Sequence, residues 1–125
     1  PGRVPSGRRS PEITHMTDVM PSMLAAAGGK PDPAWKVDGR NMLDVWSGKV
    51  KAPERTLFWE WQTEGGTMLA AMRGDYKYLD IGGNKFLYNV RTDPGERRSL
   101  IGEYPEIMKQ LETETAAWLA TAVTK

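Results

Sequence analysis

Hydrophobic residues recur at helical spacing early in the chain. Thr17 is a suitable N-cap, Asp18 favours the positive end of a helix, and Pro21 is tolerated within a first turn. The apolar residues that follow the helical period are Val19, Met20, Met23, Leu24 and Ala27. Gly28 and Gly29 then end the run. The pattern predicts a short helix with one apolar face over residues 17–28.

A second helical pattern occupies the C-terminal part of the chain. Pro105 is well placed at a first helical position, with Glu106 beside it. An apolar stripe follows, made of Ile107, Met108, Leu111, Thr115, Trp118, Leu119 and Ala122. Charged and polar residues fill the positions between. We therefore predict one long helix that covers an apolar surface.

Four short runs between the two helical patterns are typical of strands. They span residues 56–61, 67–73, 76–81 and 85–90, and turns containing glycine separate them. Such runs favour an antiparallel meander. In the third run, Tyr76, Tyr78 and Asp80 would share one face of the sheet. We predict an α+β fold: a short N-terminal helix and loop, then a four-stranded antiparallel sheet packed against the long C-terminal helix.

Residues 1–52 differ in character from residues 53–125, which hold the predicted sheet and long helix. The first ten residues contain two Pro, two Gly and three Arg, as a linker or loop would. Residues 30–50 are loop-like, with apolar anchors on one possible helical turn at Met42, Leu43, Val45 and Trp46. We expect the chain to be a segment of something longer. A processed N-terminus is the alternative.

Composition narrows the function classes. The chain has 125 residues, 17 basic against 16 acidic, so no global field favours nucleic acid or an anionic membrane. It contains no Cys, which excludes disulfides, thiolate metal sites and a Cys nucleophile in this sequence. No apolar run approaches the length of a membrane span. We expect neither nucleic acid nor a membrane as a partner.

The run Asp93-Pro94-Gly95-Glu96 follows the last predicted strand. Asp accepts backbone N–H groups in turns, Pro restricts φ, and Gly tolerates a positive φ. A catalytic pair of carboxylates would need a pocket and a perturbed environment. We therefore interpret the run as a corner that brings the chain back to the core.

Five short motifs in sequence order resemble the type I, formylglycine-dependent sulfatases of the alkaline-phosphatase-like superfamily. Each is weak alone, but their order and spacing match. The structural motif residues that carry the resemblance are Asp18, Pro21, Asp38, Gly39, Arg73, Lys77, Tyr88, Asp93, Pro94 and Glu96. The motifs themselves are PGRVPSG from Pro1, TDVMPSMLAAAG from Thr17, VDGRNM from Val37, AMRGDYKYL from Ala71, and LYNV with DPGE from Leu87. Three positions depart from the usual residue: Ser22 for Thr, Asn89 for Asp and Ser99 for Asn.

The resemblance implies a C-terminal part of an arylsulfatase-like sulfuric ester hydrolase. In that family, the residue converted to formylglycine, the calcium ligands and the groups around the sulfate lie upstream of the segment matched here. The resemblance thus implies a missing N-terminal catalytic domain as partner, with residues 1–52 at its edge. It implies that this chain holds no cofactor and is inactive alone, whereas the parent uses calcium and formylglycine. Parent sulfatases are often periplasmic, secreted or lysosomal.

The segment around two tryptophans is the best candidate for contact with a substrate. Trp59 and Trp61 would share a strand face and could stack on a sugar or aryl group, with Glu60, Gln62 and Glu64 near hydroxyl groups. The alternative is that both tryptophans belong to a core or a domain interface. His15, the one His, is a further cleft candidate, although a capping or packing role is the more usual one.

Other roles are less specific. Asp18 would be a cap or a buried hydrogen-bonding anchor, and Arg73 and Lys77 would form salt bridges rather than bind sulfate. A free-standing carbohydrate-binding or protein-interaction module remains an alternative function. Because the apolar face of the 17–28 helix would lack its usual cover, we also expect the isolated chain to self-associate, with the N-terminal segment exchanged between copies.

Overall fold

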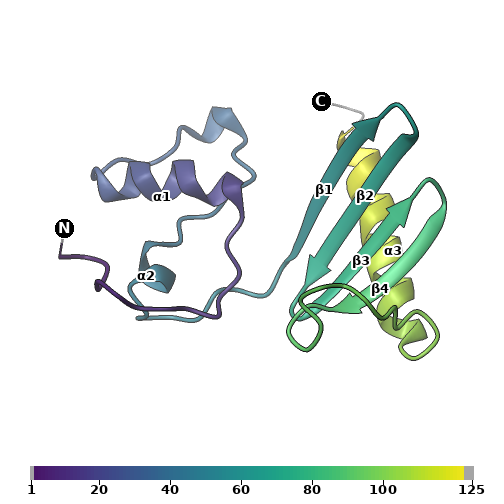
Figure 1. Cartoon of the computed structure of the whole chain (residues 1–125). Helices are drawn as coiled ribbons and strands as arrows, with labels where there is room; N and C mark the ends of the chain where they lie inside the picture. The colour runs from purple at the N-terminus through teal and green to yellow at the C-terminus, as the bar shows by residue number, and fades with distance from the viewer. Residues whose placement is uncertain (1, 123–125) are drawn as a thin grey trace. The chain divides into compact units, whose positions relative to one another are not determined.

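The computed structural model describes residues 2–122. The chain divides into two compact units, Pro1–Pro53 and Glu54–Lys125, and each is described by itself (Figure 1). No helix in the described range is long and apolar enough to cross a membrane.

The first unit is mostly loop with short helical pieces. These are the 3-10 turns η1, Met16–Asp18, and η2, Pro33–Trp35, and the helices α1, Val19–Ala26, and α2, Leu43–Trp46. The predicted helix is therefore present, although it is shorter and begins as a 3-10 turn. Gly28 ends it in the left-handed conformation, with φ of 86°. Met42 and Val45 are buried, as expected for apolar anchors in the loop.

One detail of α1 differs from the predictions. Thr17 is not the N-cap; His15 caps η1 instead, because the chain turns into a 3-10 helix before α1 begins. Val19 and Met23 on the apolar face of α1 are exposed, one of the outcomes expected for a face that lacks its usual cover. The helix packs through Pro21 and Ser22, which are buried.

The second unit contains the predicted antiparallel meander. Its strands are β1, Thr56–Thr63, β2, Gly66–Arg73, β3, Tyr76–Ile81, and β4, Asn84–Asn89, in the spatial order β1-β2-β3-β4. The register pairs Phe58 with Ala71, Ala71 with Tyr78, and Tyr78 with Leu87. These four residues consequently share one face of the sheet.

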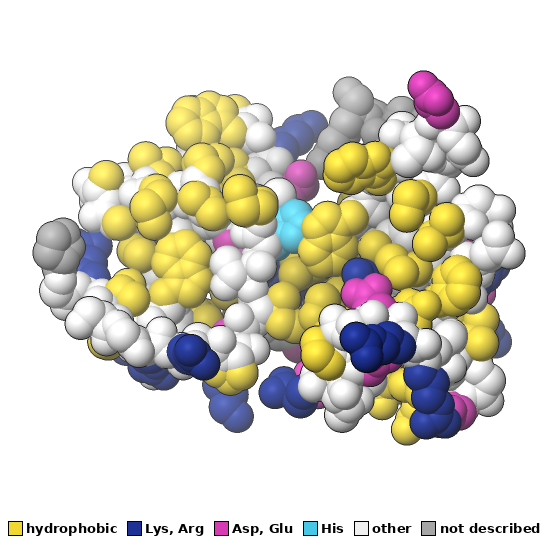
Figure 2. Space-filling view, in the orientation of Figure 1, with side chains coloured by type: hydrophobic (Ala, Val, Ile, Leu, Met, Phe, Trp, Pro, Cys, Tyr) yellow, Lys and Arg dark blue, Asp and Glu magenta, His cyan; other side chains and the backbone are white. Residues whose placement is uncertain are grey.

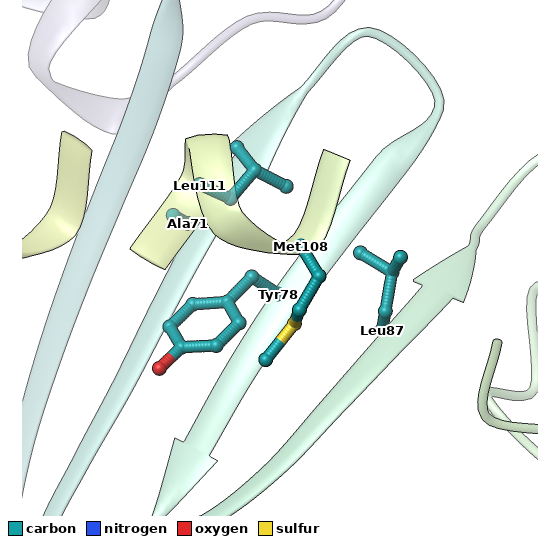
Figure 3. Close-up of a cluster of buried hydrophobic side chains, with 5 residues drawn as sticks. All are labelled: Ala71, Tyr78, Leu87, Met108 and Leu111. Carbon is teal, nitrogen blue, oxygen red and sulfur yellow. The ribbon is translucent and has the colours of Figure 1, made fainter. Parts of the chain in front are cut away.

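The helix α3, Pro105–Ala122, lies along that face, as the apolar stripe predicts. Its Met108 and Leu111 close a buried cluster with Ala71, Tyr78 and Leu87 (Figure 3). Side chains of this size each contribute about 1.5–3 kcal/mol when fully buried. Further along α3, Trp118 stacks on Phe58 with ring centroids 5.2 Å apart. The side chain of Ala122, the last position of the predicted stripe, lies outside the described residues.

The opposite face of the sheet is called the open face below. It consists of every second residue from Leu57 to Trp61, Met68 to Met72, Lys77 to Ile81 and Asn84 to Tyr88. In Figure 1 the strands lie in front of α3, so this face is turned to the viewer.

The corner after β4 is built around Asp93. Its carboxylate accepts the backbone N–H groups of Arg97 at 2.8 Å and Arg98 at 2.9 Å. The hydrogen bond from Arg98 lowers the pKa of Asp93 below its usual value, with a smaller contribution from Arg97. The left-handed residue of the corner is Glu96, with φ of 51°, and not Gly95 as the turn pattern suggests. Leu100 then donates its N–H to the carbonyl of Leu87 at 2.7 Å, which returns the chain to the edge of the sheet.

Candidate substrate-contacting site

The candidate site lies at the far end of the β1–β2 hairpin. Thr63 pairs with Gly66 across a turn at Glu64 and Gly65. The hydroxyl of Thr63 donates to the carbonyl of Gly66 at 2.8 Å, and Gly66 has a φ of 119° that favours glycine. The hairpin therefore ends in a closed turn that holds the last residues of β1 in place.

The two tryptophans share the open face, as their spacing predicts. Trp61 lies opposite Met68, and Trp59 lies opposite Ala70. Trp61 is 71% exposed and Trp59 is 39% exposed. The indole of Trp61 is thus the large aromatic surface at this end of the sheet that a planar sugar face could stack on.

The polar candidates lie on the other face of the hairpin. The amide nitrogen of Gln62 donates to the carboxylate of Glu60 at 2.5 Å, and the Gln62 oxygen accepts from the hydroxyl of Thr67 at 3.0 Å. Gln62 is thereby oriented by two neighbours. Because alternate strand residues point to opposite faces, Glu60 and Gln62 do not converge with the tryptophans on a single pocket. Glu64 lies in the turn and is exposed.

His15 belongs to the first unit and is not part of the hairpin site. Its Nδ1 accepts the N–H of Thr17 at 3.3 Å and lies 2.9 Å from the Thr17 hydroxyl. The N–H of His15 in turn donates to the carboxylate of Asp18 at 2.8 Å. The structure gives this His a capping function, while its place in a substrate cleft stays a prediction.

Asp18 anchors the loop that follows α1. Its side chain is 0% exposed, and besides His15 it accepts the backbone N–H of Arg40 at 2.9 Å. The hydroxyl of Ser22 accepts the N–H of Met42 at 2.8 Å one turn further along. Gly39 approaches so closely that an added Cβ would lie 1.9 Å from the carbonyl oxygen of Thr17. We call this arrangement the α1 clasp. It gives a structural reason for the motif residues Asp18 and Gly39. Asp38, next to Gly39 in the chain, is exposed.

Arg73 and Lys77 both form ion pairs within the second unit. Arg73 lies 3.0 Å from Glu54 and 3.2 Å from Glu114 of α3. Lys77 of β3 lies 2.7 Å from Glu96, so the carboxylate of Glu96 links the corner after β4 to a strand of the sheet. Another motif residue, Tyr88, stacks on Phe86 with ring centroids 6.2 Å apart.

The ion pair between Arg91 and Asp75 is one of several that were not predicted from the sequence. Arg91 binds Asp75 through two contacts of 2.8 Å, from Nε and from a terminal nitrogen. The hydrogen bond from Arg91 lowers the pKa of Asp75. The two residues are 16 positions apart with no shared period, so only the β3–β4 pairing could have indicated the contact.

The described residues do not fit a calcium site. Within residues 2–122, no group of three His, Asp or Glu side chains is placed to hold a metal ion. Glu54, Glu114 and Glu96 are instead paired with arginine or lysine, as described above.

Sequence comparison gives relatives of one kind. No family model matches the chain. Over 58 residues the chain is 38% identical to Arylsulfatase G of Mus musculus and 36% identical to that of Rattus norvegicus. The chain is similar to the C-terminal region of a sulfatase. Each match covers 46% of this sulfatase-like chain and 11% of the relative, so the chain spans about a tenth of the length of the curated relatives.

Solved structures share the fold of the sulfatase-like chain. Ps i-CgsB superposes with a TM-score of 0.84 at 22% identity, over 94% of this chain and 27% of that one. BT1596, a 2-O GAG sulfatase, superposes with a TM-score of 0.57 at 26% identity, over 86% and 24% of the two chains. The sheet and helix described above are therefore found within chains about four times as long.

Proposed function

We propose that this chain is the C-terminal part of a sulfuric ester hydrolase, in which it forms one wall of the substrate cleft and docks on the catalytic part. The observation that carries the proposal is the 38% identity to Arylsulfatase G over 58 residues, in a chain spanning 11% of that protein. The chemistry then belongs to the remaining polypeptide.

The composition of the chain supports the proposal that the chemistry belongs to the remaining polypeptide. A formylglycine made from cysteine cannot form here, because the sequence contains no Cys. Calcium needs several oxygen ligands at once, and residues 2–122 offer no group of three acidic or His side chains for it. In this proposal both the nucleophile and the metal come from the remaining polypeptide, and this chain supplies shape and contact.

A sulfated saccharide is the substrate class that we propose for the parent. BT4656, which superposes with a TM-score of 0.63, was solved with D-glucosamine-2-N,6-O-disulfate, and Ps i-CgsB with k-i-k-neocarrahexaose. The exposed indole of Trp61 would stack on a pyranose ring. Glu64 in the turn would accept hydrogen bonds from hydroxyl groups at the rim, whereas Gln62, oriented by Glu60 and Thr67, would contact hydroxyl groups only from the opposite face of the hairpin.

The two ligands named above, D-glucosamine-2-N,6-O-disulfate and k-i-k-neocarrahexaose, are suitable probes of this wall. We expect weak binding to the isolated chain, measured by calorimetry, because one wall alone buries little of a ligand. Trp61→Ala should weaken binding at least fivefold. Trp35→Ala is the matched control, since Trp35 is also exposed, at 61%, but lies on η2 of the first unit. Binding that survives Trp61→Ala would remove Trp61 from the site, and no binding of either ligand would contradict the cleft-wall function.

A free-standing carbohydrate-binding module is the second candidate, favoured by the exposure of Trp61. The same experiment separates the two functions. A module would bind a saccharide tightly without further polypeptide, and unsulfated sugars as well as sulfated ones. A sulfatase wall would bind weakly and would need the sulfated form for full affinity in the complete enzyme.

A further inference from the structure

The first unit contains a pocket of about 600 Å³, which we call the η2 pocket. Its lining residues all belong to the first unit, and none of them is part of the hairpin site. Small-molecule sites typically have volumes of about 300–1,000 Å³, so the pocket is large enough for a sugar ring. Its walls combine apolar and polar side chains. They include Pro21, Ala25, Pro31, Lys30, Lys36 and Asn41.

Local hydrogen bonds hold the walls of the η2 pocket in place. On one side, the α1 clasp ties the backbone of Arg40 to the start of α1 at 2.9 Å. On the other side, the carboxylate of Asp32 accepts the N–H of Ala34 at 2.9 Å and caps η2. The side-chain oxygen of Asn41 accepts the N–H of Leu43 at 3.1 Å, which leaves its NH₂ group as a donor. Walls that are fixed before a ligand arrives lower the entropic cost of binding.

Lys30 and Lys36 make the η2 pocket positively charged. Within residues 2–122, neither ammonium group has an ion pair or a hydrogen bond. Among the lining residues Asp32 is the acidic one, so two positive charges face one negative charge. The first unit as a whole has eight Lys and Arg against five Asp and Glu, and Figure 2 shows Lys and Arg side chains along its border. The local charge therefore favours an anionic ligand.

Lys36 has a backbone conformation that is costly for a lysine. It follows η2 with φ of 46° and ψ of 51°, in the left-handed region that glycine or asparagine usually occupies. Backbone strain of this kind persists where the surrounding structure imposes it, and it clusters at ligand sites. Glycine would fold here with less strain, so a lysine at this position favours a function for its ammonium group.

We propose that the η2 pocket binds a sulfated saccharide ring. The ammonium groups of Lys30 and Lys36 would contact the sulfate oxygens, and the NH₂ group of Asn41 would donate to the sulfate or to a hydroxyl group. The apolar C–H face of the ring would lie on Pro21, Ala25 and Pro31. The inference rests on the proposed function in one respect, the choice of sulfate over other anions. Because both lysines are exposed, we expect weak binding that decreases with salt.

An NMR titration of the isotope-labelled full chain with D-glucosamine-2-N,6-O-disulfate tests the proposal, because each site has its own backbone amides. The amides of Lys30 and Asn41 should shift until saturation, and they should do so equally in Trp61→Ala. Lys36→Gln should raise the dissociation constant read from these amides about threefold, and the double variant with Lys30→Gln about tenfold. Lys49→Gln is the matched control, since Lys49 is exposed in the same unit but is paired with Asp44 at 3.4 Å.

Lys36→Gly separates binding from folding. Glycine relieves the left-handed strain, so the melting temperature should rise, while the dissociation constant should rise as it does in Lys36→Gln. A Lys36→Gly variant that binds as tightly as the unchanged chain would contradict the proposal. The double lysine variant also provides the background in which calorimetry reports on Trp61 alone.

Three other results would overturn the proposal. One is the absence of saturable shifts at the pocket amides. Another is unsulfated glucosamine or inorganic sulfate that binds the pocket as tightly as the disulfate, since ring and sulfate would then not be recognised together. The third is tighter binding of glucosamine 6-phosphate, which would assign the pocket to phosphate.

The same titration distinguishes failure of this inference from failure of the proposed function. Shifts at the amides of Trp61 and Gln62 without shifts at the η2 pocket would overturn the inference and leave the cleft-wall function standing. Shifts at the η2 pocket without shifts at the hairpin would support the inference and count against the hairpin as a substrate wall.

Discussion

The carboxylate of Asp18 accepts the backbone N–H of Arg40 at 2.9 Å, across 22 positions of the chain. A second oxygen of the same group accepts from His15 at 2.8 Å, and the side chain is fully buried. One charged group therefore ties the start of α1 to the loop that returns past it. Charge-assisted bonds of this kind are among the stronger contacts in a protein.

Removal of this carboxylate should loosen the α1 clasp. Asp18→Ala leaves two backbone donors without their acceptor, and we expect a loss of about 3 kcal/mol from the free energy of unfolding. Hydrogen exchange at the amides of His15 and Arg40 should accelerate with it. Asp44→Ala is the matched control: it removes an exposed carboxylate whose ion pair with Lys49 spans 3.4 Å, and it should cost at most about 1 kcal/mol. Equal losses in the two variants would contradict the anchoring function of Asp18.

Gly39 is the position of the clasp with the least room. An added Cβ would meet the carbonyl carbon of Thr17 at 2.3 Å and the nitrogen of Asp18 at 2.8 Å, and both are backbone atoms that cannot rotate away. Gly39→Ala should therefore destabilise the chain by about 1–3 kcal/mol. Gly102→Ala, where a Cβ meets nothing within 4 Å, should change stability little. Thermal unfolding of both variants is the measurement, and a Gly39→Ala variant as stable as Gly102→Ala would exclude the close approach.

The corner after β4 should make the stability of the folded chain depend on pH in the acid range. Backbone hydrogen bonds hold the pKa of Asp93 below its usual value of 3.8, so the charged form is favoured in the folded state. That stability is fully present above the unfolded value and is lost as pH falls through the folded one. Asp93→Asn should lower the melting temperature at pH 7 and flatten its fall below pH 4. Asp44→Asn is the control. If the melting temperature of Asp93→Asn fell below pH 4 as steeply as that of the unchanged chain, the prediction would be contradicted.

Tyr78 should limit stability on the alkaline side. Burial, helped by the charges of Asp80 and Glu112, raises the pKa of Tyr78 from 10.0 to about 12. The neutral phenol is favoured in the folded state, so its contribution is complete below pH 10 and is lost as pH rises toward 12. Tyr78→Phe should flatten the alkaline loss in urea unfolding between pH 9 and 11.5. Tyr104→Phe, which removes a hydroxyl from an exposed residue, should retain the loss seen in the unchanged chain.

The sheet and the long helix could be predicted because the hydrophobic periodicity of each element, and the glycines of the turns between the strands, can be recognised within short segments of the sequence. Pro105 begins α3, and Met108 and Leu111 of its stripe enter the core, as the helical period requires. A capping role for His15 was among the expectations from its position, but the 3-10 turn that it caps could not be predicted, because a 3-10 turn and an α-helix have the same kind of start in sequence. Glu96 takes the left-handed conformation and the neighbouring Gly95 does not, and the ion pair of Glu96 with Lys77 joins residues 19 positions apart, which no local pattern contains.

The candidate site was predicted in part, for the same reason. Period two correctly places Trp59 and Trp61 on one face and Glu60 with Gln62 on the other. The pairing of Arg73 with Glu114 and of Asp75 with Arg91 depends on contacts between elements, which no local pattern contains. The same holds for the open face, because its apolar character becomes visible only when the four strands are aligned through their three registers.

The most direct test of the central claim is hydrolysis of a generic aryl sulfate by the purified chain, with calcium present and an arylsulfatase as positive control. The account predicts no turnover above background, because the chain contributes a wall and a docking surface and the chemistry lies on other polypeptide. Turnover by the chain itself would contradict this. Loss of that turnover in His15→Ala or Glu60→Gln would then place a different mechanism on these 125 residues.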